Sequence, residues 1–166
     1  RLTRGVLAMV LPYPGRFRMA LQLARLGRPL APLFDRVASL KPFAAMLRLA
    51  PKSVPPASAS AQPAVHAANA APNVTARGRV AILTGCAQPV LDPGINAATI
   101  ALLTRLGIEV VVPQGEGCCG SLVHHMGREE QALAAARRNV DVWMREVETG
   151  GLDAVIITAS GCGTTI

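Results

Sequence analysis

Short apolar runs in the second half of the chain alternate with longer segments in which apolar residues recur every three or four positions. The runs cover residues 79–84, 108–112 and 154–158. Continuous apolar runs of this length are typical of strands that are buried on both faces. The segments between them, 95–106 and about 128–147, have the spacing of amphipathic helices. This order of elements predicts an α/β fold with a parallel sheet of βαβ units, covered by helices on both faces.

The longer of the two predicted helices has an acidic first turn and an apolar stripe. Glu129 and Glu130 lie in the first turn, where acidic side chains interact favourably with the helix dipole. We expect the apolar stripe to pack on the sheet. Its residues are Leu133, Ala136, Val140, Trp143 and Val147.

The first fifty residues have a different pattern, in which helical spacing is interrupted by glycine and proline. Segments 14–27, 31–40 and 42–49 predict short amphipathic helices that end near these breakers. We expect residues 1–50 to form a basic helical connector. Its apolar stripe can pack on a neighbouring domain with the arginines in solvent, and docking to a membrane surface or a partner subunit is the alternative.

Positive charge is concentrated in this connector. The chain has a net charge of +7, yet residues 1–52 carry ten Lys or Arg and a single acid, Asp35. Residues 80–166 carry five Arg and nine acids, so the basic character does not extend to the cysteine-bearing part. Aromatic residues make up only 3% of the chain, which argues against base stacking in a nucleic-acid site. We expect no nucleic-acid partner.

Between the connector and the first strand the composition changes. Residues 51–78 are rich in Ala, Pro, Ser and Asn without periodicity, which predicts a flexible linker. His66 lies in it and is interpreted as a bystander rather than a ligand. Residues 79–166 form the predicted cysteine-rich domain. Because the chain begins with Arg1 and stops four residues after Cys162, we expect a fragment whose last domain is truncated at its C-terminal end.

The sequence contains no apolar run of the roughly 20 residues that a membrane-spanning helix needs. The run Val6–Leu11 is six residues long, ends at Pro12, and leads to no small-residue cleavage site of the kind that follows a signal peptide. Without an export signal, the sequence favours the cytoplasm. Thiols stay reduced there and serve as metal ligands or catalytic groups rather than in disulfides.

The four cysteines each follow the carboxyl end of a predicted strand. Cys86 follows the first strand, adjacent Cys118 and Cys119 follow the second in a glycine-rich turn, and Cys162 follows the third. Parallel strands present their carboxyl ends at one edge of the sheet, where open α/β folds bind their ligands. A disulfide between two neighbouring cysteines would strain the S–S geometry. We therefore predict that the four thiols converge on one centre.

Four converging thiolates suit a soft, thiophilic centre. Structural zinc usually takes tight C-x₂-C pairs, which this sequence lacks, so the wide spacing favours an iron–sulfur cluster over zinc. Thiol redox catalysis and buried, unrelated cysteines remain alternatives. His124 and His125 follow the cysteine turn and are either additional ligands or a surface pair.

The same turn formally matches the dinucleotide-binding fingerprint G-x-G-x-x-G through Gly115, Gly117 and Gly120. The match is weak, because it follows the second strand and no acid ends the next strand. Thiols also occupy the positions that would approach a pyrophosphate. We interpret the turn as a thiol centre rather than a nucleotide site.

Motifs around the cysteines resemble a known family. They are Thr84-Gly85-Cys86-Ala87-Gln88-Pro89, Gly117-Cys118-Cys119-Gly120 and Thr158-Ala159-Ser160-Gly161-Cys162-Gly163. Together they are similar to the cysteine-rich CCG domain in the iron–sulfur subunits of glycolate oxidase, anaerobic glycerol-3-phosphate dehydrogenase and heterodisulfide reductase. Two further stretches, Asn96-Ala97-Ala98-Thr99 and Arg138-Asn139-Val140-Asp141, add to the resemblance to the glycolate oxidase iron–sulfur subunits.

The resemblance implies an electron-transfer subunit that has no catalytic residues of its own. It implies a [4Fe–4S] cluster ligated by Cys86, Cys118, Cys119 and Cys162. In the fullest family pattern a further cysteine stands where this chain has Ala159, so the resemblance implies four thiolate ligands rather than five.

The resemblance also implies partners for such a subunit. Flavin-containing subunits would oxidise glycolate to glyoxylate, and electrons would pass towards a membrane acceptor. The basic N-terminal helices would hold the protein at the inner face of the membrane. A thiol redox subunit of the heterodisulfide-reductase kind and a non-redox domain for subunit assembly are the alternatives.

Overall fold

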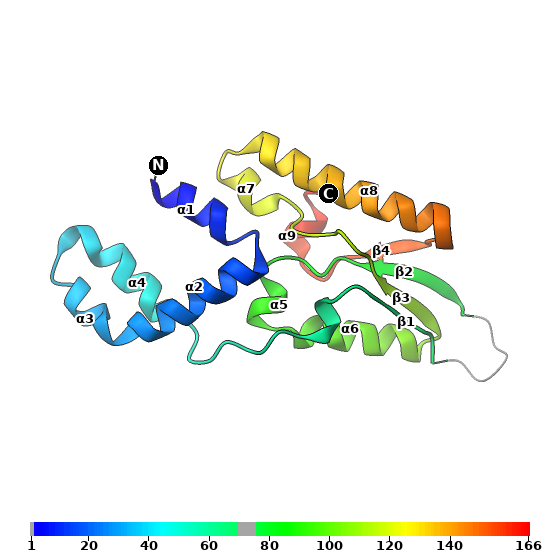
Figure 1. The fold of residues 1–166 in the computed structure, drawn as a ribbon, viewed down its shortest axis with the longest axis horizontal. Helices are drawn as coiled ribbons and strands as arrows, with labels where there is room; N and C mark the ends of the chain where they lie inside the picture. The colour runs from blue at the N-terminus through cyan, green and yellow to red at the C-terminus, as the bar shows by residue number, and fades with distance from the viewer. Residues whose placement is uncertain (1, 70–75) are drawn as a thin grey trace.

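A computed structural model of the chain describes residues 2–69 and 76–166, and residues 70–75 of the predicted linker lie outside the described residues. A four-stranded sheet forms its centre (Figure 1). The strands are β1 (Ala64–His66), β2 (Gly78–Ile82), β3 (Ile108–Val112) and β4 (Ala154–Ile156), in the order β1-β3-β2-β4. β2 pairs in parallel with both β3 and β4. The predicted α/β fold with a parallel sheet is confirmed.

The fourth strand, β1, was not predicted. It lies in the segment interpreted as a linker and pairs antiparallel with β3, with Val65 opposite Val111. Three residues are too few to show a strand period in the sequence. Backbone hydrogen bonds to the edge of β3, rather than an apolar side-chain pattern, define this strand.

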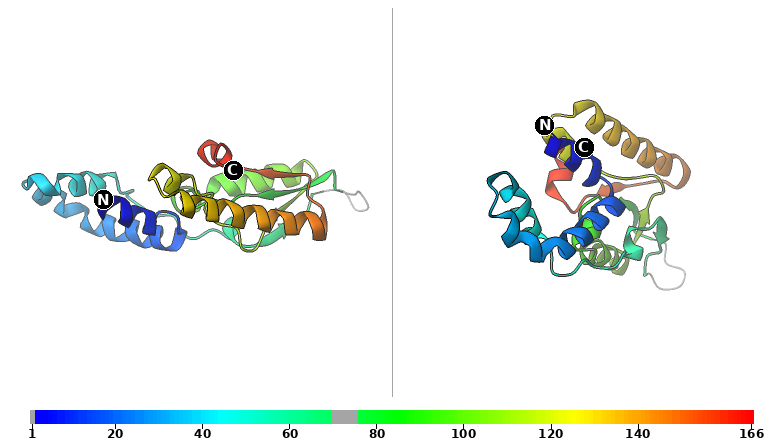
Figure 2. Two further views of the ribbon diagram at one scale, coloured as in Figure 1. Left: turned by 90° about the horizontal axis from the view of Figure 1, so that it is seen from above. Right: turned by 60° about the vertical axis from the view of Figure 1, so that its left-hand side comes forward.

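Helices cover both faces of the sheet, α6 (Gly94–Arg105) on one and α8 (Glu129–Gly150) on the other (Figures 1 and 2). Because the strand pleat sends neighbouring side chains to opposite faces, two separate cores form. The core on the α6 side contains Val80, Ile82, Ile100, Val110 and Val112. The core on the α8 side contains Ala81, Leu83, Cys119, Val142 and Trp143.

The buried face of α8 differs from the predicted stripe. Leu133, Val140 and Val147 are between 42% and 45% exposed, so that part of the prediction is wrong. The buried residues are instead Ala132, Asn139, Val142 and Trp143. The helix is rotated so that a polar residue, Asn139, faces inwards, and the hydrogen bonds of this residue, described below, supply the physical reason.

Three short helices follow the strands at the carboxyl edge of the sheet. They are α5 (Gln88–Leu91) after β2, α7 (Ser121–His125) after β3, and α9 (Ser160–Gly163) after β4. At the opposite edge, Arg79 holds the strand starts together. Its guanidinium donates to Glu109 of β3 at 2.7 Å and to Glu146 of α8 at 2.8 Å. The two edges therefore differ in kind, with an ion-pair network at one and the thiols at the other.

The residues before the sheet form a helical arm that extends from one end of the α/β domain (Figures 1 and 2). We use the name helical arm for residues 2–50. Its elements are α1 (Leu2–Val10), α2 (Pro14–Gly27), η1 (Arg28–Leu30), α3 (Ala31–Phe34), η2 (Ala38–Leu40) and α4 (Lys41–Leu49). A further short turn, η3 (Ala59–Ala61), precedes β1.

Two of the three predicted helices in the arm are confirmed as α2 and α4, and both have proline in the first turn, where its missing N–H is not needed. The prediction of one helix over 31–40 is wrong. The segment divides at Val37, whose backbone is extended, into α3 and η2. This break lets α3 fold back on α4, where Arg48 pairs with Asp35.

The arm contacts the α/β domain through one alanine of α1 and one arginine of α2. Ala8 of α1 packs against Val123 and Ala132. Arg18 of α2 donates to the carbonyl oxygens of Pro55 and Pro89, the latter at 3.2 Å. None of the helices in the described part of the chain combines the length and the apolar character that crossing a bilayer requires.

Candidate functional site

The four thiols lie together at the carboxyl edge of the sheet. Cys86 follows β2, Cys118 and Cys119 follow β3, and Cys162 lies in α9 after β4. Their side chains lie close enough to influence one another, Cys86 with Cys118, Cys118 with Cys119, and Cys119 with Cys162, and we name the four side chains the thiol row. All four are free thiols. The structure thus brings together the four residues that the strand order placed on one edge.

Burial differs along this row. Cys118 is 5% exposed and Cys119 is 2% exposed, whereas Cys86 and Cys162 are partly exposed. Cys119 belongs to the apolar core beneath α8, and Cys162 packs against the same core. The centre of the row is therefore shielded from water, and its two ends are accessible.

Interactions between the thiols separate their proton affinities. Interaction with the Cys118 thiol lowers the pKa of Cys86. Interactions with the Cys118 and Cys162 thiols lower the pKa of Cys119 to about 3. The pKa values of Cys118 and Cys162 are raised in turn, because ionising either of them beside a neighbouring thiolate is costly. Cys86 and Cys119 are the thiols most ready to become thiolates, the form that binds metal.

The turn that carries Cys118 and Cys119 requires glycine at its end. Gly120 has φ = +95°, in the left-handed region that glycine adopts without penalty. A Cβ at this position would lie 2.6 Å from the carbonyl oxygen of Ala132 in α8. Because the backbone of Gly120 approaches α8 so closely, α7 begins at the next residue, Ser121. The N–H of Ser121 donates to the Cys119 sulfur at 3.4 Å.

Asn139 of α8 fastens the same turn to the helix. Its Oδ1 accepts from the N–H of Gly117 at 2.9 Å, and its Nδ2 donates to the carbonyl oxygens of Gly117 and Cys118 at 3.4 and 3.2 Å. The side chain is fully buried. One amide therefore satisfies three backbone groups, and it fixes the position of the Cys118 backbone.

A second polar group connects the loops of Cys86 and Cys162. The Nε2 of Gln88 donates to Oδ1 of Asn96 in α6 and, at 2.8 Å, to Oγ1 of Thr158. Asn96 is fully buried, and its Nδ2 donates to the carbonyl oxygen of Thr84 at 3.1 Å. Thr84 and Gln88 lie on either side of Cys86, and Thr158 lies four residues before Cys162. The network sets the spacing of the two partly exposed thiols.

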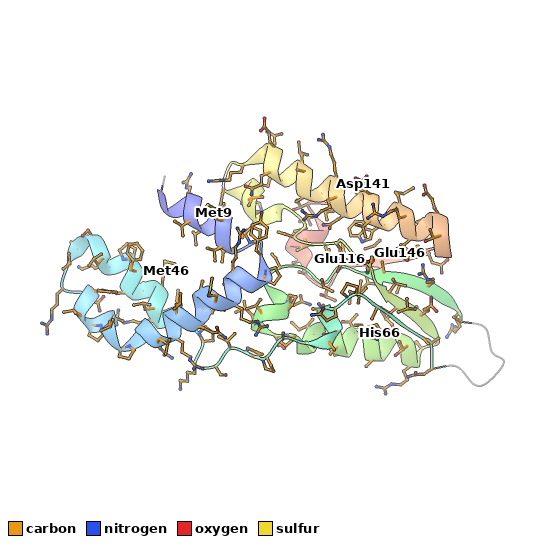
Figure 3. All side chains as sticks on the ribbon, in the orientation of Figure 1. Met9, Met46, His66, Glu116, Asp141 and Glu146 are labelled. Carbon is orange, nitrogen blue, oxygen red and sulfur yellow. The ribbon has the colours of Figure 1, made fainter. Side chains whose placement is uncertain are left out.

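Glu116 ties the glycine-rich turn to the end of β2 (Figure 3). Its Oε1 accepts from the N–H of Thr84 at 2.9 Å and from the Thr84 hydroxyl at 2.7 Å. Its Oε2 is buried and has no hydrogen-bond partner among the described residues. Burial raises the pKa of this carboxyl, although both bonds from Thr84 act in the opposite sense.

These contacts also bear on the dinucleotide fingerprint. The N–H of Gly117 is already donated to Asn139, so it is not available to a phosphate. The helix that follows, α7, has only five residues. Both observations argue against nucleotide binding at this turn.

The two histidines lie beside the thiol row rather than within it. His124 and His125 are exposed on α7, with ring centroids 5.9 Å apart. With Thr164 and Thr165 they line a cavity of about 310 Å³ against α8. Neither imidazole is among the interaction partners of the thiols in the described part of the chain, and the exposure of both rings favours the interpretation of a surface pair.

The donor set indicates which centre the thiols fit. Across the described residues, no three His, Cys, Asp or Glu side chains surround a single point closely enough to ligate one metal ion. The four thiols come from three separate loops, whereas structural zinc sites usually take tight C-x₂-C pairs. A multi-iron cluster is larger and is commonly held by four cysteine thiolates from separate loops.

The separation of the thiol pKa values predicts an order of alkylation. In the full-length protein freed of iron, we expect iodoacetamide at pH 7 to modify Cys86 at least about tenfold faster than Cys118. Because its pKa is lowered, Cys86 remains a thiolate at a lower pH than an ordinary thiol does, and its labelling rate falls only below that pKa. Cys118 is buried and stays protonated, because its pKa is raised. Peptide mass spectrometry measures both rates. In denaturant the two alkylation rates should be equal. Equal alkylation rates in the folded protein would contradict the predicted order.

Asn139, Gln88, Asn96 and Glu116 were not predicted as parts of the site. The sequence signal for Asn139 is its place between Ala132 and Val142 on the buried side of α8, where an amide needs partners. Three of these residues stand within the motifs that carried the family resemblance, and Glu116 directly precedes a fourth. The structure explains those motif positions as the hydrogen-bonding groups that hold the cysteine loops.

Comparisons with known proteins place the same half of the chain in a family. The model of the CCG cysteine-rich domain matches residues 80–166. The chain is 36% identical over 163 residues to the glycolate oxidase iron-sulfur subunit of Escherichia coli (strain K12). That match covers 98% of this chain and 34% of the E. coli protein.

Other relatives match about half of this chain. A probable glycolate oxidase iron-sulfur subunit of Bacillus subtilis (strain 168) is 35% identical over 85 residues, 51% of this chain and 18% of that protein. A fumarate reductase (CoM/CoB) subunit from Methanothermobacter marburgensis is 33% identical over 88 residues, 53% of this chain and 17% of that protein. The chain therefore spans about a third or less of these relatives. No solved structure matches it.

Proposed function

The chain belongs to the family of proteins that carry the CCG cysteine-rich domain, and from this premise we propose that it is part of an iron–sulfur subunit that relays electrons in an oxidoreductase. The observation that carries the proposal is the single row formed by the four thiols at the carboxyl edge of the sheet. The relatives named as iron-sulfur subunits support it.

Cys86, Cys118, Cys119 and Cys162 would hold the cluster, and four thiolates are the set that a [4Fe–4S] cluster takes. When bound, such a cluster supplies one-electron transfer. The lowered pKa values of Cys86 and Cys119 favour deprotonation before metal binding. The apolar core around Cys119 excludes water from one side of the site.

The reaction proposed for the assembled protein is oxidation of glycolate to glyoxylate. This assignment follows the names of two relatives and the motif resemblance. A flavin-containing partner subunit would carry out the oxidation, and electrons would leave towards a membrane acceptor. The ten Lys or Arg of residues 1–52 support a position at the inner, anionic face of the membrane.

We assign the parts of the chain accordingly. Residues 79–166 would form the cluster-binding domain and residues 1–50 the connector to the rest of the assembly. Residues 51–78 would serve as the linker between them, with β1 attaching this linker to the sheet edge.

The relay is tested in the complex with its flavin subunits. With Cys118 and Cys119 both changed to serine, glycolate should still reduce the flavin at the wild-type rate, while reduction of the external acceptor should fall by at least about a hundredfold. Stopped-flow absorbance follows both steps. Unchanged acceptor reduction in the variant complex would rule out a relay through these thiols.

A further inference from the structure

The helical arm buries no large apolar side chain. In residues 4–50, the part of the arm whose side chains the structure describes, the buried residues are alanines and one proline: Ala8, Pro12, Ala31, Ala44 and Ala50. By contrast Met46 and Leu49 of α4 are 47% and 83% exposed. Packing of an apolar face supplies most of the stability of protein helices. The arm therefore presents apolar surface that another element must cover.

Part of this surface is a groove. It has a volume of about 300 Å³ and lies between α1, α2 and α4. Residues that line it include Leu7, Val10, Phe17, Leu21, Met46 and Leu49, and Met46 is labelled in Figure 3. Nearly all of its lining is apolar. A groove formed by three helices matches the side-chain anchors of an amphipathic helix, which recur at spacings of three and four.

Basic residues are close in sequence to the residues that line this groove. Arg4 precedes Leu7 by three positions on α1, Arg28 follows Leu21 by seven positions at the end of α2, and Lys52 comes shortly after α4. The only acid in residues 1–52, Asp35, is paired with Arg48. An occupant with acidic residues beside its apolar anchors would complement this charge.

We propose that the groove receives an acidic amphipathic α-helix of a partner subunit. This inference rests on the proposed function in taking the chain as one subunit of an assembly. A second copy of the chain would bring like charges together, which is unfavourable. A bilayer is met by apolar side chains that protrude from a helix face, whereas the lining of the groove is concave, so the groove itself is not the part of the arm that would meet a membrane.

Site-specific cross-linking in the complex identifies the occupant. The photoreactive residue p-benzoylphenylalanine replaces Leu21 in the groove, or Leu23 on the exposed side of the same helix as a matched control. The expected cross-link from position 21 joins a partner-subunit peptide that is acidic and has apolar residues at helical spacing, and position 23 gives none. A cross-link to the same polypeptide, to a second copy or to lipid, or no cross-link, overturns the proposal.

Substitutions give an independent measure of docking. Leu21→Asp should lower the amount of partner subunit that co-purifies with the full-length chain at least tenfold, while Leu23→Asp leaves it unchanged. Arg28→Glu, a surface change that should not disturb folding, is expected to lower it about threefold at low salt. Full recovery with Arg28→Glu at low salt would count against the proposal even where Leu21→Asp fails to fold.

Iron content separates this result from the cluster proposal. The arm variants should keep wild-type iron, because the groove shares no residue with the thiol row. Loss of the partner with iron retained supports the groove as a docking site. If Leu21→Asp loses iron but keeps the partner subunit, the docking proposal is overturned. The cluster assignment is then decided by the cysteine substitutions alone.

Discussion

Changing Cys119 to serine in the full-length protein is expected to remove about four iron atoms per chain, the content of one [4Fe–4S] cluster. Cys119 is 2% exposed and interacts with both the Cys118 and the Cys162 thiols. A serine hydroxyl is a poor ligand for a soft centre and its pKa is far higher. Iron and acid-labile sulfide, measured after anaerobic purification, give the result.

Ser160→Ala provides the matched control for this loss. Ser160 is exposed and lies two residues from Cys162, so its substitution changes the same edge of the sheet without removing a thiol. We expect wild-type iron and sulfide in the control. If Cys119→Ser also kept its full iron and sulfide content, Cys119 would not be a ligand.

Asn139→Leu is expected to destabilise the turn that carries Cys118 and Cys119. The substitution keeps the side-chain size but leaves the N–H of Gly117 and the carbonyl of Cys118 without partners. Leaving such buried groups unsatisfied costs about 1–3 kcal/mol. The variant should unfold at a lower denaturant concentration than the wild type. It should also lose iron to a chelator at least about tenfold faster, and the decrease in absorbance at about 400–420 nm follows this loss over a period on the order of minutes.

Two further variants separate the hydrogen bonds from the general stability of α8. Asp141→Asn changes an exposed residue two positions along the helix and should behave as wild type (Figure 3). Asn139→Asp keeps an acceptor for the N–H of Gly117 and loses the donor to Cys118, so an intermediate rate of iron loss is expected. Identical chelation rates in Asn139→Leu and Asp141→Asn would show that Asn139 does not position the turn.

The strands and the convergence of the thiols could be predicted because each rests on a strong, local pattern. A short run such as 108–112 is typical of a buried central strand, and β3 occupies the same residues. Parallel order then fixes the edge at which Cys86 and Cys162 emerge, without any long-range information. The convergence of four cysteines that are far apart in the sequence could therefore be predicted from the sequence.

The parts that could not be predicted depend on contacts between distant segments. α1 forms around an apolar run of six residues, which is too short to show a helical period. Its Ala8 packs against Val123 and Ala132. β1 is defined by backbone pairing to β3. The rotation of α8 depends on Asn139 finding the backbone of Gly117, which helical periodicity alone does not encode. In each case tertiary partners, rather than local propensity, decide the outcome.

The central claim is that the row of four thiols ligates an iron–sulfur cluster, and Mössbauer spectroscopy of ⁵⁷Fe-enriched full-length protein tests it most directly. The spectrum of a variant with Cys86, Cys118, Cys119 and Cys162 all changed to serine is subtracted from that of the wild type. We predict a difference spectrum that accounts for about four irons of a [4Fe–4S] cluster, with all other iron components unchanged. Superimposable spectra of the two proteins would contradict the assignment.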